Sequence, residues 1–142
     1  MIRSRFRRSA WAAVLCVGAT GPAFAHHSFL SYEPNVQIRF TGIVTNYEWT
    51  NPHVYIELDV PDEEGGTKHW LIEGANPGIL NRVGWKWNMI GVGDEISVIV
   101  SPLRNGESGA LLKAVRLADG TIFSNGGPAG PARLSFEDSE AP

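Results

Sequence analysis

Apolar and polar residues alternate along several short stretches of the chain, which is the pattern of β-strands that bury one face. The clearest stretch runs from Val54 to Val60, where every second residue is aliphatic and the residues between are mostly polar. The same alternation predicts four more strands, over residues 36–45, 67–73, 95–101 and 111–117. Gly42 interrupts the first of these and predicts a bend or a bulge there.

One short helix is predicted between the third and fourth strands. Asn76 has the chemistry of an N-cap, Pro77 suits the first helical position, and Gly84 ends the helix. The order of elements matches the OB-fold, a small five-stranded Greek-key barrel. We therefore expect an all-β fold with one short helix, an OB-like barrel over residues 36–123. Most of the large apolar residues after the helix are expected to close one end of its core: Trp85, Trp87, Met89 and Ile90.

The first 25 residues have the three-part composition of a secretory signal peptide. Four arginines in Met1–Arg8 precede a short apolar run, Ala10–Ala19, and small residues follow up to Ala25. The apolar run is about half of the roughly 20 residues that a membrane-spanning helix needs. We therefore expect cleavage after Ala25, a periplasmic or secreted product, and no membrane span in the mature protein.

Cleavage changes the length and charge of the chain. It leaves 142 − 25 = 117 residues, which suits one domain with an N-terminal arm at 26–35 and a disordered Gly-, Pro- and acid-rich tail at 124–142. The mature chain keeps all 15 acids but only 12 − 4 = 8 bases, so its formal charge is 8 − 15 = −7. This charge repels phosphate backbones, so nucleic acid is not an expected partner.

The one cysteine of the chain, Cys16, lies in the predicted signal peptide and is removed with it. We therefore expect no disulfide and no thiolate in the mature protein.

The new N-terminus is the first candidate site, because cleavage would make His26 the first residue. Its α-amine and its imidazole can chelate one metal ion, and His27 adds another nitrogen. Such donors suit Cu(II), Ni(II) or Zn(II), and copper is bound most tightly of the divalent ions. A ligand from the barrel, His53 or His69, would complete the site, and we favour His53. The alternative interpretation is that the paired histidines form only a polar arm.

The outer face of the second and third strands is the second candidate, because OB-folds bind ligands there and on the adjoining loops. Aromatic rings beside carboxylates and amides suit a glycan or another small polar ligand, or a partner protein. In the alternative interpretation, Tyr55 and Leu71 form a cross-strand pair and the acids are solvated. The predicted ligand-binding residues are Trp49, Asn51, Tyr55, His69, Glu73 and Arg104.

Catalytic motifs offer little support for an enzyme. The chain has no Gly-x-Ser-x-Gly elbow, no His-Glu-x-x-His pair, no phosphate loop and no dinucleotide fingerprint. Glu48, Glu57 and Glu73 could act as an acid and a base, but nothing in their spacing requires it. The sequence therefore favours binding over catalysis and leaves the ligand open.

Several short motifs occur in a consistent order along the mature chain. They are His26-His27-Ser28, Phe40-Thr41-Gly42-x-Val44, Glu48-Trp49-Thr50-Asn51-Pro52-His53, Asn76-Pro77, Gly84-Trp85 and Gly93-Asp94-Glu95. With these motifs the chain resembles a family of small exported bacterial proteins catalogued as a domain of unknown function, type 6152. The resemblance implies export and one barrel-like domain, and it favours a role for His26, His27 and His53. Trp87 and the tail depart from the family pattern.

Overall fold

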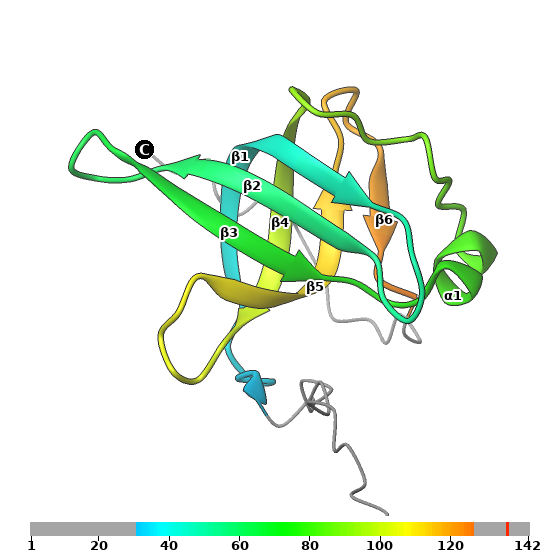
Figure 1. The fold of residues 1–142 in the computed structure, drawn as a ribbon, viewed down its shortest axis with the longest axis horizontal. Helices are drawn as coiled ribbons and strands as arrows, with labels where there is room; N and C mark the ends of the chain where they lie inside the picture. Colours follow the sequence, from blue (N-terminus) through cyan, green and yellow to red (C-terminus); the bar gives the residue numbers. More distant parts are fainter. Residues whose placement is uncertain (1–30, 127–135, 137–142) are drawn as a thin grey trace, which may run out of the picture.

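A computed structural model describes residues 31–126 and residue 136 of the chain (Figure 1). Its elements are β1 (Ile38–Glu48), β2 (Tyr55–Pro61), β3 (Thr67–Glu73), α1 (Pro77–Arg82), β4 (Glu95–Pro102), β5 (Gly109–Arg116) and β6 (Ile122–Ser124). The predicted order of five strands with a short helix after the third is confirmed. The short strand β6 is added at the end, where it pairs with β5.

The sheet closes into a barrel because β3 pairs with two strands. Antiparallel ladders join the strands in the order β3-β2-β1-β4-β5-β6, and β3 also pairs with β5. This closing ladder is parallel and sets Leu71 opposite Gly109 and Glu73 opposite Leu111. The ring β1-β2-β3-β5-β4 is a small Greek-key barrel of the OB type, so the predicted fold class is confirmed.

Alternate aliphatic residues of the strands fill the barrel, as the periodicity predicts. Val54, Ile56 and Leu58 are each no more than 1% exposed. Burying an aliphatic side chain of this size contributes roughly 1.5–3 kcal/mol to folding. The predicted first strand begins too early, because Val36 is exposed and precedes the first ladder pair, at Ile38.

The short helix begins as the sequence predicts. The side chain of Asn76 accepts a hydrogen bond from the amide of Ile79 at 2.9 Å, and Pro77 is the first helical residue. Gly84 follows the helix with a φ of +98°, a conformation that favours glycine. The helix contacts the barrel core through Leu80, which is fully buried, and the chain continues past Gly84 to Trp85.

Trp85 closes this end of the core. It is fully buried, and its indole N–H donates to the carbonyl oxygen of Ser124 at 2.8 Å. Ile90 is also buried, whereas Trp87 is 70% exposed. Met89 is partly buried against the core, so most of the four residues close it as predicted, and Trp87 is the exception.

Gly42 lies where two strands approach closely, and not at a bulge. The irregularity of β1 falls between Val44 and Asn46 in its ladder with β2. A Cβ at Gly42 would lie 2.7 Å from the carbonyl oxygen of Asp59 and 2.9 Å from Cγ2 of Val60. The sequence-based interpretation of a bulge at Gly42 is wrong, and the physical reason for glycine is the proximity of β2.

The described barrel continues past its predicted end at Phe123. The amide of Asn125 donates to the carbonyl oxygen of Lys113 at 3.0 Å, and its side chain accepts from the amide of Ala75 at 2.7 Å. The predicted signal peptide, residues 26–30 of the arm and most of the tail lie outside the described residues, so those assignments stay predictions. Within the described part of the chain, no helix is long and apolar enough to cross a membrane.

Replacing Gly42 by alanine is expected to lower the free energy of unfolding by about 1–3 kcal/mol, because the new methyl group meets the backbone of β2. Urea denaturation of the two proteins measures this difference. Gly91→Ala is the matched control, since a Cβ there meets nothing closer than 3.6 Å. Its effect should stay within about 0.5 kcal/mol. Equal effects at the two glycines would contradict the close approach at Gly42.

Candidate functional site

The buried carboxylate of Glu73 joins two segments that are distant in the sequence. Glu73 ends β3 at an outward-facing position, yet it is only 7% exposed. The hydroxyl of Tyr32 donates to its Oε2 at 2.7 Å, and Nδ1 of His53 lies 3.4 Å from its Oε1. One acid therefore ties the N-terminal segment to the loop between β1 and β2.

Tyr32 fixes the point at which the predicted arm meets the barrel. It is buried and forms an isolated antiparallel bridge with Leu103, and the amide of Arg104 donates to the carbonyl oxygen of Ser31 at 2.9 Å. Burial raises the pKa of Tyr32, and its hydrogen bond to Glu73 adds to this shift. The hydroxyl therefore stays protonated and remains a donor. Sequence analysis did not identify Tyr32, because it lies in a segment without periodicity.

The ring of His53 has a defined orientation. Its Nδ1 lies 3.1 Å from the carbonyl oxygen of Gly74, which can only accept, so Nδ1 carries the proton. In the neutral ring this leaves a lone pair on Nε2, for which the described residues supply no hydrogen-bond partner. The side chain is 29% exposed. A histidine that donates from one ring nitrogen to a carbonyl or a carboxylate is oriented as metal-binding histidines usually are.

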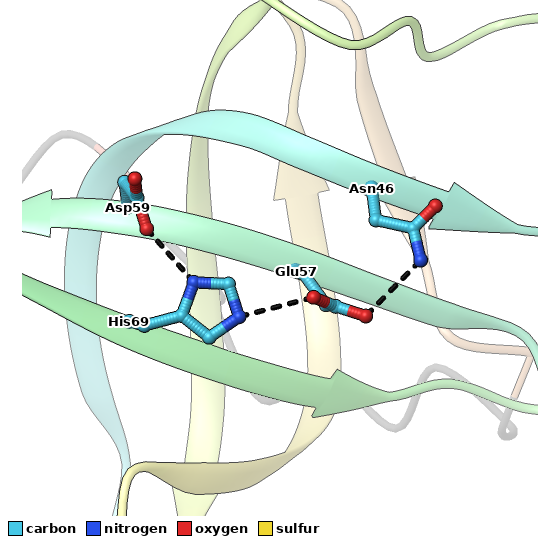
Figure 2. Close-up of polar contacts among 4 residues, drawn as sticks. All are labelled: Asn46, Glu57, Asp59 and His69. Carbon is cyan, nitrogen blue, oxygen red and sulfur yellow. Dashed lines mark hydrogen bonds and ion pairs between the residues drawn. The ribbon is translucent and has the colours of Figure 1, made fainter.

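His69 has both ring nitrogens engaged by acids (Figure 2). Nδ1 lies 2.8 Å from Oδ1 of Asp59, and Nε2 lies 3.0 Å from Oε2 of Glu57, whose other oxygen accepts from Asn46. The hydrogen bond with Asp59 is the largest cause that raises the pKa of His69; burial lowers it, and Glu57 raises it further. This favours the imidazolium, which has no lone pair for a metal ion.

The two barrel histidines lie at different places on the outer face. His69 is opposite Asp59 and Glu73 is opposite Tyr55 in the ladder of β2 and β3. Four residues of a strand span about 13 Å, so His69 lies well away from the contact between Glu73 and His53. Of the two histidines considered as the barrel ligand, only His53 has a ring nitrogen without a partner among the described residues.

The predicted ligand-binding residues form no single group. Tyr55 lies opposite Glu73, and burial is the main cause that raises its pKa, followed by Glu73 and Glu48. Trp49 is partly buried against the core, with its ring 6.1 Å from that of Tyr47. Asn51 is exposed, and Arg104 lies 3.4 Å from Glu33. The structure thus brings Tyr55 and Glu73 together with His53. The ligand face itself stays a prediction.

A complete metal site is not present within residues 31–126 and 136, where no three His, Cys, Asp or Glu side chains are placed to hold an ion. His26 and His27 lie outside these residues. Metal binding at His53 would therefore need donors from the predicted arm.

Comparison with known proteins gives a family and a distant structural likeness. A model described as "Family of unknown function (DUF6152)" matches residues 13–113. Two crystal structures of the mitochondrial single-stranded DNA-binding protein Rim1 from S. cerevisiae are similar to the chain. One is 13% identical with a TM-score of 0.45, covering 58% of this chain and 93% of its own. The other is 12% identical with a TM-score of 0.41, covering 64% and 97%. No curated protein matches the chain.

Tyr32→Phe is expected to lower the free energy of unfolding by about 1.5–3 kcal/mol, because the buried Glu73 carboxylate loses its hydroxyl donor. Thermal and urea denaturation near neutral pH measure the loss. Tyr55→Phe is the matched control, since the described residues offer the Tyr55 hydroxyl no hydrogen-bond partner. If both substitutions destabilise equally, the bond from Tyr32 does not hold the segment.

An NMR titration is expected to give His69 a pKa above its ordinary value of 6.5. Asp59→Asn should reduce this elevation more than Glu57→Gln, in line with the order of the causes.

The raised pKa of His69 also predicts a pH-dependent stability. A group whose pKa is raised on folding stabilises the fold below its unfolded pKa, and this stabilisation disappears as the pH rises through the folded pKa. Wild type should therefore show its full stability advantage over His69→Gln below the ordinary pKa of 6.5 and lose it as the pH rises through the folded-state pKa. The advantage should stay below about 1 kcal/mol, because the pair is exposed.

Proposed function

The chain belongs to this family of unknown function, and we propose that the mature protein is an exported binding protein that holds a transition metal ion, copper in preference to others. In this proposal the α-amine and ring of His26, the ring of His27 and Nε2 of His53 are the donors. Periplasmic or secreted localisation and cleavage after Ala25 are parts of the same proposal. The metal is bound and no catalytic step is assigned to it.

The contact of Tyr32 and His53 with one carboxylate is the observation that supports this proposal. Because Tyr32 donates to Oε2 of Glu73 and His53 lies beside Oε1, the described part of the arm is held next to the carboxylate that the barrel histidine contacts. Residues 28–30 lie between His27 and the described chain, and a chain of four residues spans at most about 14 Å. In this proposal that short connection brings His26 and His27 to His53.

The donor set favours copper over harder ions. Amine and imidazole nitrogens suit Cu(II), Ni(II) and Zn(II), and copper has the highest affinity in the Irving–Williams order. Thiolates are missing from the proposed mature chain, which disfavours sites built for soft Cu(I). Nδ1 of His53 donates to the carbonyl oxygen of Gly74, and Oε1 of Glu73 lies 3.4 Å from the same nitrogen, so the ring is oriented with Nε2 as the atom that would bind the metal.

Copper titration of protein recovered from the periplasm without an affinity tag tests the proposal. Intact mass should first show that the chain starts at His26. His26→Ala and His53→Gln should each weaken Cu(II) binding by about tenfold or more, because each removes donors from one ion. His69→Gln is the matched control and should bind copper as the wild type does, because both nitrogens of His69 are engaged by acids.

A chain with one extra residue before His26 keeps every imidazole but moves the amine away from the first histidine. It should bind copper more weakly than the correctly processed form. Equal affinity of wild type, His26→Ala and His53→Gln would overturn the metal site. An unprocessed precursor in the cytoplasm would overturn the proposed export.

The outer face of β2 and β3 is the second candidate, as a non-catalytic surface for a glycan, a small molecule or a partner protein. Two observations support this candidate. The half-exposed ring of His69 is held between Glu57 and Asp59, and the side chain of Leu71 on the same face is 46% exposed. Substituting Tyr55 or Trp49 by alanine would impair this binding and leave copper affinity unchanged, which separates the two candidates. Nucleic acid remains outside the proposal, because the mature chain would carry a formal charge of −7.

A further inference from the structure

A single aromatic residue far along the C-terminal segment is buried on the outside of the barrel. Phe136 is 3% exposed and packs against Ile99 of β4 and Ala114 of β5. The centre of its ring lies 5.6 Å from Cζ of Arg39 and 5.2 Å from Cζ of Arg116. Two guanidinium groups within about 6 Å of one ring are in the range of cation–π attraction.

Phe136 lies in a shallow site on the outer face of β1, β4 and β5, called the slot below, and the pairing of these strands explains how it is built. Arg39, Ile99 and Ala114 lie directly opposite one another across β1, β4 and β5. They form one row on the outer surface, and Phe136 lies over this row. The slot therefore has an aliphatic floor and cationic sides, which fits a flat aromatic ring.

The next row of the same face is polar and hollowed. It consists of Thr41, Ser97 and Arg116, and the two hydroxyl oxygens lie 2.7 Å apart. Arg116 reaches Ser97 only through a long hydrogen bond of 3.5 Å, and it has no carboxylate partner among the described residues. A hollow of about 300 Å³ lies over this row, bounded by Glu95 and by the turn that follows β5. Among the described residues, Ser97 is thus the one side chain that hydrogen-bonds the guanidinium of Arg116, which borders the hollow.

We propose that the outer face of β1, β4 and β5 is a docking site for a peptide segment in which a phenylalanine is followed by acidic residues. The resident occupant is the chain's own Phe136, which closes the slot in cis. A segment of the same chemistry from a second molecule displaces it. The aromatic ring fills the slot over Ile99, and a carboxylate reaches Arg116, Ser97 and Thr41 in the hollow.

The sequence around Phe136 matches this site in charge. Glu137 and Asp138 follow directly, and Glu140 lies two positions further on. Arg39 and Arg116 are two of only eight bases in the proposed mature chain. The sequence of this segment, one phenylalanine among acids, thus suits a site where two of the few cations flank an aliphatic floor. Carboxylates pair with guanidinium groups through directed hydrogen bonds, which adds selectivity to the contact of the ring.

A labelled peptide with the sequence of residues 133–142 tests the proposal by fluorescence anisotropy on the full mature chain. Phe136→Ala should bind the peptide, whereas the wild type should bind it at least about tenfold more weakly, since its tethered Phe136 competes at high effective concentration. A peptide with alanine in place of phenylalanine should not bind. A peptide with its acids changed to amides should bind about tenfold more weakly at low salt.

Arg116→Gln, introduced into the Phe136→Ala chain, should weaken peptide binding, and Arg82→Gln on the exposed end of α1 is the matched control. A second measurement covers the case in which Phe136→Ala does not fold: a millimolar peptide carrying a nitroxide spin label should broaden the NMR methyl signals of Ile99 in the wild type. Absence of binding to a folded Phe136→Ala chain overturns the proposal, as does an Ile99 signal that the labelled peptide leaves unbroadened. Binding that ignores the peptide's phenylalanine or Arg116 also overturns it. None of these measurements involves the histidines of the proposed metal site.

Discussion

The buried carboxylate of Glu73 is the constraint on which the N-terminal half of the surface depends. An ionised acid out of contact with water costs several kcal/mol unless hydrogen bonds replace its hydration. Tyr32 and His53 lie against its two oxygens, and neither residue belongs to a strand of the barrel. The acid can therefore be buried only if the N-terminal segment and the loop between β1 and β2 lie against the end of β3. The orientation of His53 follows from the same requirement.

The alternation of apolar residues predicts the barrel well, because the inner face of every strand must be aliphatic whatever covers the outside. It does not predict what covers the outer face. Glu73 occupies an outward position in the period-two pattern, and its burial comes from Tyr32, in a segment with no pattern of its own. Gly42 shows the same limit, because only the pairing of β1 with β2 reveals that a side chain there would meet the neighbouring backbone.

The residues of the candidate site can be predicted from their types, but the contact between them cannot. His53 and Glu73 were both identified from residue type, but they were assigned to two different sites, a metal centre and a ligand face. The structure joins them through a contact that depends on how the chain turns before β2. Likewise, the register between β2 and β3 sets Asp59 opposite His69. That pairing engages the ring of His69 and leaves His53 as the barrel histidine with a ring nitrogen that no described residue engages.

Each described terminal segment is held on the barrel by one aromatic residue against charged groups, and the two contacts differ in kind. Tyr32 is fixed through its hydroxyl on a buried carboxylate, a directional bond that sets the position of the chain to within ångströms. Phe136 is held by burial over Ile99 and Ala114 and by the faces of two guanidinium groups, which tolerate sliding and exchange. In the proposed metal site, a directional bond suits a segment that has to deliver metal donors to a defined place. In the proposed docking site, a non-directional contact suits a segment that another molecule of similar chemistry can replace. The two contacts of the barrel thus fit the two proposals in different ways, one through a fixed hydrogen bond and the other through an exchangeable ring.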